Sequence, residues 1–158
     1  AAMEIKGDKP EDELYKGRIS YLLGENKDAI SYLEKAKEHK QMLASYYLGL
    51  AYDANGDSDK AKKCIAEYIK SGVATSYDLY ELGMQEMQDG NYKNALTYFN
   101  SGLELEKVPN KQNLMKSAIA AYEYSGDFDS AKKMMKEYLK AYPDDEEAKH
   151  ENTFLETR

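Results

Sequence analysis

The stretch that decides the fold is YLGLAYDANGDSDKAKKCIAEY, residues 47–68. In its second half, Ala61, Ile65 and Tyr68 recur at i, i+4 and i+7, the spacing of one helix face. Gly56, between the two halves, can adopt the left-handed conformation that ends a helix, and Asp57 can cap the next one. Gly49 stands inside the first half, where glycine lowers the stability of a helix by about 1 kcal/mol relative to alanine. The stretch therefore predicts two helices that meet at a tight turn and pass closely near Gly49.

The same markers recur along the chain. Turn glycines stand at Gly24, Gly56, Gly90 and Gly126, separated by 32, 34 and 36 residues. An alanine follows each by five positions, and a mid-helix glycine precedes the first three by seven. A period near 34 is typical of helical hairpin repeats. We expect a close approach of two helices at each mid-helix glycine, with the alanine as the matching small residue. These positions are Ala29, Ala61, Ala95 and Ala131, with Gly17, Gly49 and Gly83.

This pattern resembles the tetratricopeptide repeat over residues 10–142, most of the chain. The two small-residue series match the family's small positions, and its large position in the second helix is filled by Leu33, Ile65, Phe99 and Met135. The family's late aromatic matches Tyr52 and Tyr122, and its closing proline matches Pro143 and, after a two-residue insertion, Pro109. The sequence departs from the family where Glu13, Ser45, Leu79 and Met115 replace a tryptophan, and where Ile119 replaces a glycine.

The resemblance implies an all-α, right-handed superhelical solenoid. We predict helical hairpins over residues 10–39, 42–70, 76–106 and 111–141. The domain division predicted from them is a tail at 1–9, four repeats at 10–41, 42–75, 76–110 and 111–143, and a C-terminal capping helix within 144–158. Glu13, Lys16 and Ser20 are polar where later repeats are mostly apolar. We interpret them as an N-terminal edge that no earlier repeat covers.

The composition argues against several function classes. The 29 acidic residues outnumber 22 basic ones, for a net charge of −7, and no basic stripe indicates a nucleic-acid surface. No apolar run approaches the roughly 20 residues that cross a bilayer. Cys64 is the only cysteine, so no internal disulfide can form. The chain opens on Ala1-Ala2-Met3 without a signal peptide, which leaves the cytoplasm open, as well as an extracytoplasmic lipoprotein whose signal has been removed.

In this family the first helices line a concave face that commonly binds a peptide or a partner's helix. Helix geometry places Leu14, Tyr21 and Ala120 on that face, together with the residues that we expect to contact a partner. The predicted partner-binding residues are Arg18, Tyr46, Leu50, Asp53, Tyr77, Tyr80, Met84, Met87, Lys116 and Tyr124. Tyr and Met suit a surface that buries apolar or aromatic side chains. The alternative is that about half of them merely pack on their neighbours.

No constellation points to catalysis, a cofactor or a metal. His39 and His150 lie in distant repeats, and Cys64 has no evident base beside it. Asp53 to Asp57 resembles the start of a calcium loop, but Ser58 and Cys64 stand where that loop needs Gly and Glu. The acidic run at 144–147 suits the first turn of a helix.

The sequence thus predicts a non-catalytic adaptor that holds a partner's peptide in its concave groove. Two alternatives stay open. The aromatic surface could mate with a second copy of the chain, or the chain could be the soluble part of a bacterial cell-surface lipoprotein.

Overall fold

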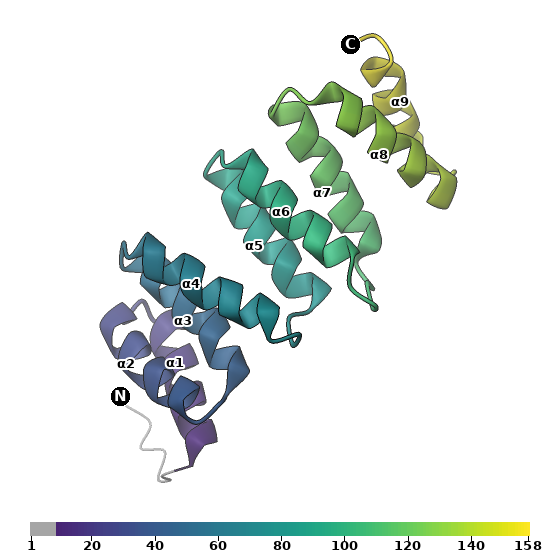
Figure 1. Cartoon of the computed structure of the whole chain (residues 1–158). Helices are drawn as coiled ribbons and strands as arrows, with labels where there is room; N and C mark the ends of the chain where they lie inside the picture. Colours follow the sequence, from purple (N-terminus) through teal and green to yellow (C-terminus); the bar gives the residue numbers. More distant parts are fainter. Residues whose placement is uncertain (1–8) are drawn as a thin grey trace. The chain divides into compact units, whose positions relative to one another are not determined.

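The computed structural model describes residues 9–158, and the part of the predicted N-terminal tail at 1–8 lies outside them. The described residues form helices and no strand, which confirms the expected all-α helical-repeat fold (Figure 1). The helices are α1 Pro10–Leu22, α2 Asn26–Glu38, α3 Met42–Ala54, α4 Ser58–Lys70, α5 Ser76–Gln88, α6 Tyr92–Leu103, α7 Lys111–Tyr124, α8 Phe128–Ala141 and α9 Glu146–Leu155.

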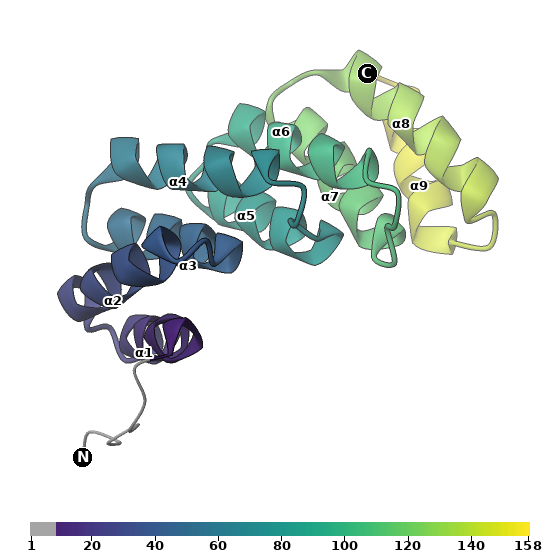
Figure 2. The same cartoon turned by 60° about the horizontal axis from the view of Figure 1, so that its bottom comes forward.

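The turns within the hairpins follow the chemistry of the repeating glycines. Gly24, Gly56, Gly90 and Gly126 all have φ between 74° and 86°, a left-handed conformation that glycine adopts without a Cβ penalty. Each ends the first helix of a hairpin, and the second helix begins two residues later. The two helices of every hairpin then pack side by side (Figures 1 and 2).

The mid-helix glycines mark the predicted close approaches. A β-carbon at Gly17 would lie 2.5 Å from Cγ of Leu33, and one at Gly49 would lie 2.6 Å from Cδ1 of Ile65. The close approach is therefore confirmed, but the partner differs from the expected alanine. In the three hairpins that have a mid-helix glycine, the nearest atoms belong to the large residue four positions after that alanine, because the large side chain fills the space that the glycine leaves.

The chain divides into two compact units, at residue 74. The N-terminal unit contains α1 to α4, and its core is built mainly from alanines and Leu33, Leu48 and Cys64. The C-terminal unit contains α5 to α9. Its core has one cluster around Phe99 and Leu114 and another around Met135, Tyr138 and Leu155.

The interpretation of α1 as a polar edge is wrong. Ser20 is buried, and Glu13 and Lys16 are partly buried, 3.8 Å apart, with the Lys16 ammonium also over the ring of Tyr32 on α2. These polar residues face inward because the hairpin packing sets the rotation of α1. The exposed face is apolar instead, and it consists of Tyr15, Ile19, Leu22 and Leu23.

The last hairpin accommodates the residue that replaces its glycine. Ile119 is buried on α7, and the large position opposite it on α8 is Met135, whose flexible thioether adapts to irregular gaps. Beyond this hairpin, α9 packs on α8 and buries Ala148 and Leu155. Asp145 caps α9 by accepting a hydrogen bond from the backbone N–H of Ala148 at 3.0 Å.

Candidate functional site

Three predicted partner-binding residues lie together on α5. Tyr80, Met84 and Met87 are half-buried, and they pack on the core cluster that contains Phe99. The Tyr80 ring centroid is 6.2 Å from that of Phe99, and the Sδ of Met84 lies 3.6 Å from the Ser117 hydroxyl on α7. The stems of these side chains are thus held by the core while part of each stays open to solvent. We call these three residues the α5 patch.

A second group lies on the facing surfaces of α1 and α3 in the N-terminal unit. The guanidinium of Arg18 lies 4.8 Å from the ring centroid of Tyr47, and the Tyr21 ring lies 6.4 Å from the same ring. Burial, and then the negative charge of Asp53 and the neighbouring Tyr47, raise the pKa of Tyr21. Leu50 is half-buried and Asp53 is exposed. These five residues form the α1–α3 patch.

Sequence reasoning missed Tyr47, whose ring contacts both Arg18 and Tyr21. It selected the adjacent Tyr46, which is buried at 6 % exposure, with its ring centroid 5.3 Å from that of Tyr68 on α4. Two consecutive tyrosines point in different directions on a helix, and only the packing of α3 decides which one stays accessible. Tyr46 therefore belongs to the core side of α3.

The remaining predicted residues lie outside these two patches, although Tyr77 is also on α5, three residues before Tyr80. Tyr77 and Tyr124 are exposed, and Tyr124 stacks on Tyr92 with ring centroids 5.4 Å apart, beside the turn that contains Gly90. Lys116 is exposed on α7, but its ammonium lies 2.7 Å from the carboxylate of Asp145. It therefore helps to hold the start of α9.

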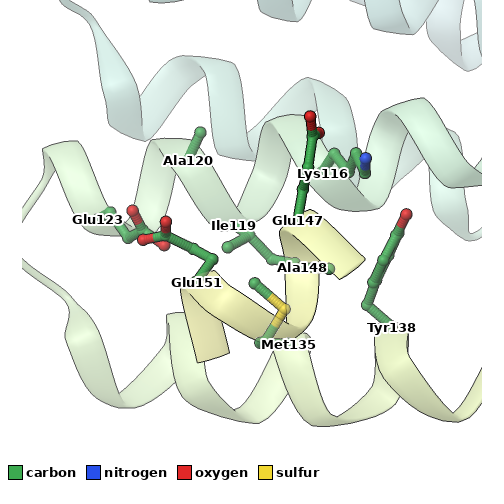
Figure 3. Close-up of a pocket in the computed structure, with 9 residues that line it drawn as sticks. All are labelled: Lys116, Ile119, Ala120, Glu123, Met135, Tyr138, Glu147, Ala148 and Glu151. Atoms are coloured by element: carbon green, nitrogen blue, oxygen red, sulfur yellow. The ribbon is translucent and has the colours of Figure 1, made fainter. Parts of the chain in front are cut away.

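Lys116 also borders a cavity of about 290 Å³ between α7, α8 and α9, which we call the α9 pocket (Figure 3). Its apolar lining comes from Ile119 and Ala120 on α7, Met135 on α8 and Ala148 on α9. Its polar lining consists of Lys116, Glu123, Tyr138, Glu147 and Glu151.

Two carboxyl groups lie next to one another at one end of the α9 pocket, from Glu123 on α7 and Glu151 on α9 (Figure 3). Burial, and then the charge of Glu151 and a hydrogen bond to it, raise the pKa of Glu123 to about 7. The Oε1 atom of Glu123 is buried and has no hydrogen-bond partner. At the other end, the Lys116 ammonium and the Tyr138 hydroxyl both donate to Asp145, which lowers the pKa of that carboxyl far below its usual range.

The arrangement and burial of the side chains in residues 9–158 bear on whether they could take part in catalysis or metal binding. No group of three or more His, Cys, Asp or Glu side chains in that range is arranged to hold a metal ion. Cys64 is buried, and burial raises the pKa of its thiol, which disfavours the nucleophilic thiolate. None of the described helices is both long enough and apolar enough to span a bilayer.

Comparisons with known proteins agree with this architecture. The family model of the tetratricopeptide repeat matches residues 43–71 and 112–145. A search of curated proteins found no match. Among solved structures, the chain is similar to MamA from Desulfovibrio magneticus RS-1 (18 % identity, TM-score 0.63). That alignment covers 96 % of this chain and 86 % of the MamA chain.

Two further solved structures show the same fold. YrrB, described as a TPR protein with an unusual peptide-binding site, is 18 % identical with a TM-score of 0.63, over 97 % of this chain and 79 % of its own. A putative kinesin light chain with TPR-like repeats, from Podosopora anserina, is 15 % identical with a TM-score of 0.59, over 94 % and 87 %. The repeating glycines, the hairpins they produce and the two matched segments lead to one conclusion: the chain has the fold of tetratricopeptide-repeat proteins and matches that family's model at residues 43–71 and 112–145.

Proposed function

We propose that this protein is a non-catalytic interaction module that binds a peptide segment of another protein on its first helices. The observation that carries the proposal is the α5 patch, in which an aromatic ring and two thioethers are anchored on the core and remain partly open. Tyr offers apolar area with a hydrogen-bonding tip, and Met adapts to irregular partners. Both residue types are enriched in protein interfaces.

The α1–α3 patch supports the same function in the N-terminal unit. Arg18 over the Tyr47 ring presents a cation and an aromatic surface together, with the carboxylate of Asp53 nearby. Such a combination suits polar and aromatic groups of a peptide. The net charge of −7 favours a protein partner over a nucleic acid. The peptide-binding site described for YrrB, whose fold this chain shares, is consistent with the proposal.

Peptide-display selection on the purified protein tests the proposal. The test variant is Tyr80→Ala/Met84→Gln/Met87→Gln, which removes the apolar surface of the α5 patch. The matched control is Val73→Ser/Phe154→Ser, which removes exposed apolar area in the turn before α5 and on α9, away from the first helices. Circular dichroism must first show that both variants keep their helix content.

Selected peptides should bind the parent and the control with equal affinity. They should bind the α5 variant at least tenfold more weakly, because a few buried anchors carry most of an interface's energy. Equal binding to all three proteins would rule out the α5 patch as the working surface. If no peptide is enriched on the parent, the proposal of peptide binding fails.

Self-association is a second candidate function, and the exposed face of α1 favours it. Tyr15, Ile19, Leu22 and Leu23 form an apolar stripe, with Leu22 exposed at 76 % and Leu23 at 68 %. Such stripes mark interaction surfaces in soluble proteins. Sedimentation over a hundredfold concentration range should show a dimer that Ile19→Ser/Leu22→Ser abolishes. A concentration-independent monomer mass would dismiss this candidate.

A further inference from the structure

The α9 pocket joins an apolar floor to an excess of negative charge. Three carboxylates line it, from Glu123, Glu147 and Glu151, against one ammonium, that of Lys116. That ammonium is already 2.7 Å from Asp145, which does not line the pocket. The local field of the pocket is therefore negative, and no cation among its lining residues is left to compensate it.

The carboxyl group of Glu123 is hydrogen-bonded to another acid, Glu151, instead of being paired with a cation. The Oε1 of Glu123 is buried without a hydrogen-bond partner, and the carboxyl lies next to that of Glu151 (Figure 3). Burial, and then the charge of Glu151 and the hydrogen bond to it, disfavour ionisation of Glu123 and raise its pKa to about 7. A cation beside the pair would favour the ionised form of both carboxyl groups and relieve the repulsion between them.

We propose that the α9 pocket receives a basic side chain, arginine or lysine, of the partner segment. This inference rests on the proposed function and specifies the chemistry of the partner. The methylene stem would lie along Ile119 and Met135, and the charged head would pair with Glu123 and Glu151. A cavity of about 290 Å³ is at the small end of ligand pockets, which suits one side chain. Basic side chains regularly bury an apolar stem beneath a charged head.

The composition of the site distinguishes this occupant from a metal ion. Within residues 9–158 no group of three or more acidic, histidine or cysteine side chains could hold a metal. Two carboxylates can pair with the charged head of an organic cation, and the apolar floor of Ile119, Met135 and Ala148 can contact its stem. A hydrated metal ion would leave that floor unused.

The test uses capped pentapeptides with glycine at every position except the third, which carries arginine, lysine, citrulline or norleucine. Citrulline is the neutral counterpart of arginine, and norleucine keeps an alkyl stem without the charge. Methyl NMR of Ile119, Met135 and Ala148 reports binding in the pocket. The arginine and lysine peptides should shift these methyl signals, with dissociation constants at least fivefold lower than those of citrulline and norleucine.

Two variants with the same net charge locate the effect. Glu123→Gln/Glu151→Gln removes the carboxyl pair, and it should raise the dissociation constant of the arginine peptide at least fivefold. Glu106→Gln/Glu137→Gln removes two exposed carboxylates, one from the loop before α7 and one from α8, and it should leave the dissociation constant unchanged. Affinity for the arginine peptide should also rise from pH 6 to pH 8, because the cation binds the ionised form of Glu123, and this rise should disappear in Glu123→Gln.

Three results would overturn the inference: equal binding of the citrulline and arginine peptides, no methyl shift with any peptide, or equal weakening by both variants. Its failure is distinguishable from that of the proposed function. If selected peptides depend on the α5 patch but are insensitive to Glu123→Gln/Glu151→Gln, the interaction function stands and the basic anchor fails. If the pentapeptides bind the pocket while no selected peptide depends on the α5 patch, the basic anchor stands and the α5 patch fails as the binding surface.

Discussion

Gly83 of α5 lies directly against the ring of Phe99 on α6, so that a β-carbon at residue 83 would be 2.6 Å from Cδ1 of that ring. Phe99 is fully buried, and close-packed protein interiors leave little space into which such a ring could move. Alanine at residue 83 would favour the helix by about 1 kcal/mol. The steric overlap should outweigh this gain, since overpacking a close-packed core costs about 1–3 kcal/mol.

We therefore expect Gly83→Ala to lower the free energy of unfolding by roughly 1 kcal/mol or more, measured by urea denaturation. A second substitution provides the control. Phe99→Leu shortens the opposing side chain, so Gly83→Ala should cost less in the Phe99→Leu background than alone. Purely additive effects in this double-mutant cycle would contradict the proposed contact.

Lys40, in the turn between α2 and α3, has a φ of 59°, which is uncommon for a residue with a β-carbon. The corresponding turn between α4 and α5 has Gly72 at φ 75°. Lys40→Gly should raise the free energy of unfolding by about 0.5–1 kcal/mol, because it removes the left-handed strain. The control Lys62→Gly, at an exposed position inside α4, should lower it by about 1 kcal/mol. A destabilising Lys40→Gly would contradict the strain argument.

Asp145 holds the start of α9 to two other helices. Its carboxylate accepts hydrogen bonds from the Tyr138 hydroxyl at 2.5 Å and from the Lys116 ammonium at 2.7 Å, and it caps the N–H of Ala148. Asp145→Asn keeps a capping oxygen but loses the charge, whereas Asp145→Ala loses both. Amide hydrogen exchange of Ala148 should therefore be fastest in Asp145→Ala, intermediate in Asp145→Asn and slowest in the parent. The same rate in all three would show that α9 docks independently of Asp145.

The carboxyl pair of the α9 pocket makes the stability of the C-terminal unit depend on pH. The pKa of Glu123 is raised from its ordinary value of 4.5 to about 7, so the folded protein holds this proton more tightly than the unfolded chain. The free energy of unfolding should therefore be highest below about pH 4.5 for this group, and should fall as pH rises to about 7. The charged and titratable neighbours from α7, α8 and α9 are Lys116, Tyr138, Glu147 and Glu151.

Glu123→Gln should remove this fall and stabilise the protein at pH 8 by on the order of 1 kcal/mol, since solvent at the open pocket screens the two carboxylates. Urea denaturation at pH 5, 6, 7 and 8 measures the effect. Glu106→Gln, at an exposed loop position, should keep the pH dependence of the parent. If Glu123→Gln retains that dependence, another group is responsible for it.

The predicted hairpins agree with the helices because their signals are local. A glycine with positive φ, such as Gly56, acts within its own turn, and the periodicity of Ala61, Ile65 and Tyr68 is a property of one helix. The predicted right-handed superhelix and the division into four repeats and a cap remain expectations. Helix geometry predicted Tyr80, Met84 and Met87 as one group together with Tyr77, although the role of the α5 patch as a binding surface remains a proposal.

The sequence by itself determined the helical-repeat class, the sites of close helix approach and the positions of the hairpins, apart from the end of the third, which is at Leu103 and not at 106. Glycine and alanine spacing reports backbone conformation directly. Only the tertiary structure decided which side chains remain accessible. It buries Tyr46 and exposes the apolar stripe of α1, and it engages Lys116 with Asp145. It also brings Glu123 and Glu151, 28 positions apart in the chain, next to one another at one end of a single pocket. The physical reason is that the rotation of a helix and the pairing of its side chains depend on how neighbouring helices pack against it. The periodicity of a single helix carries no information about that packing.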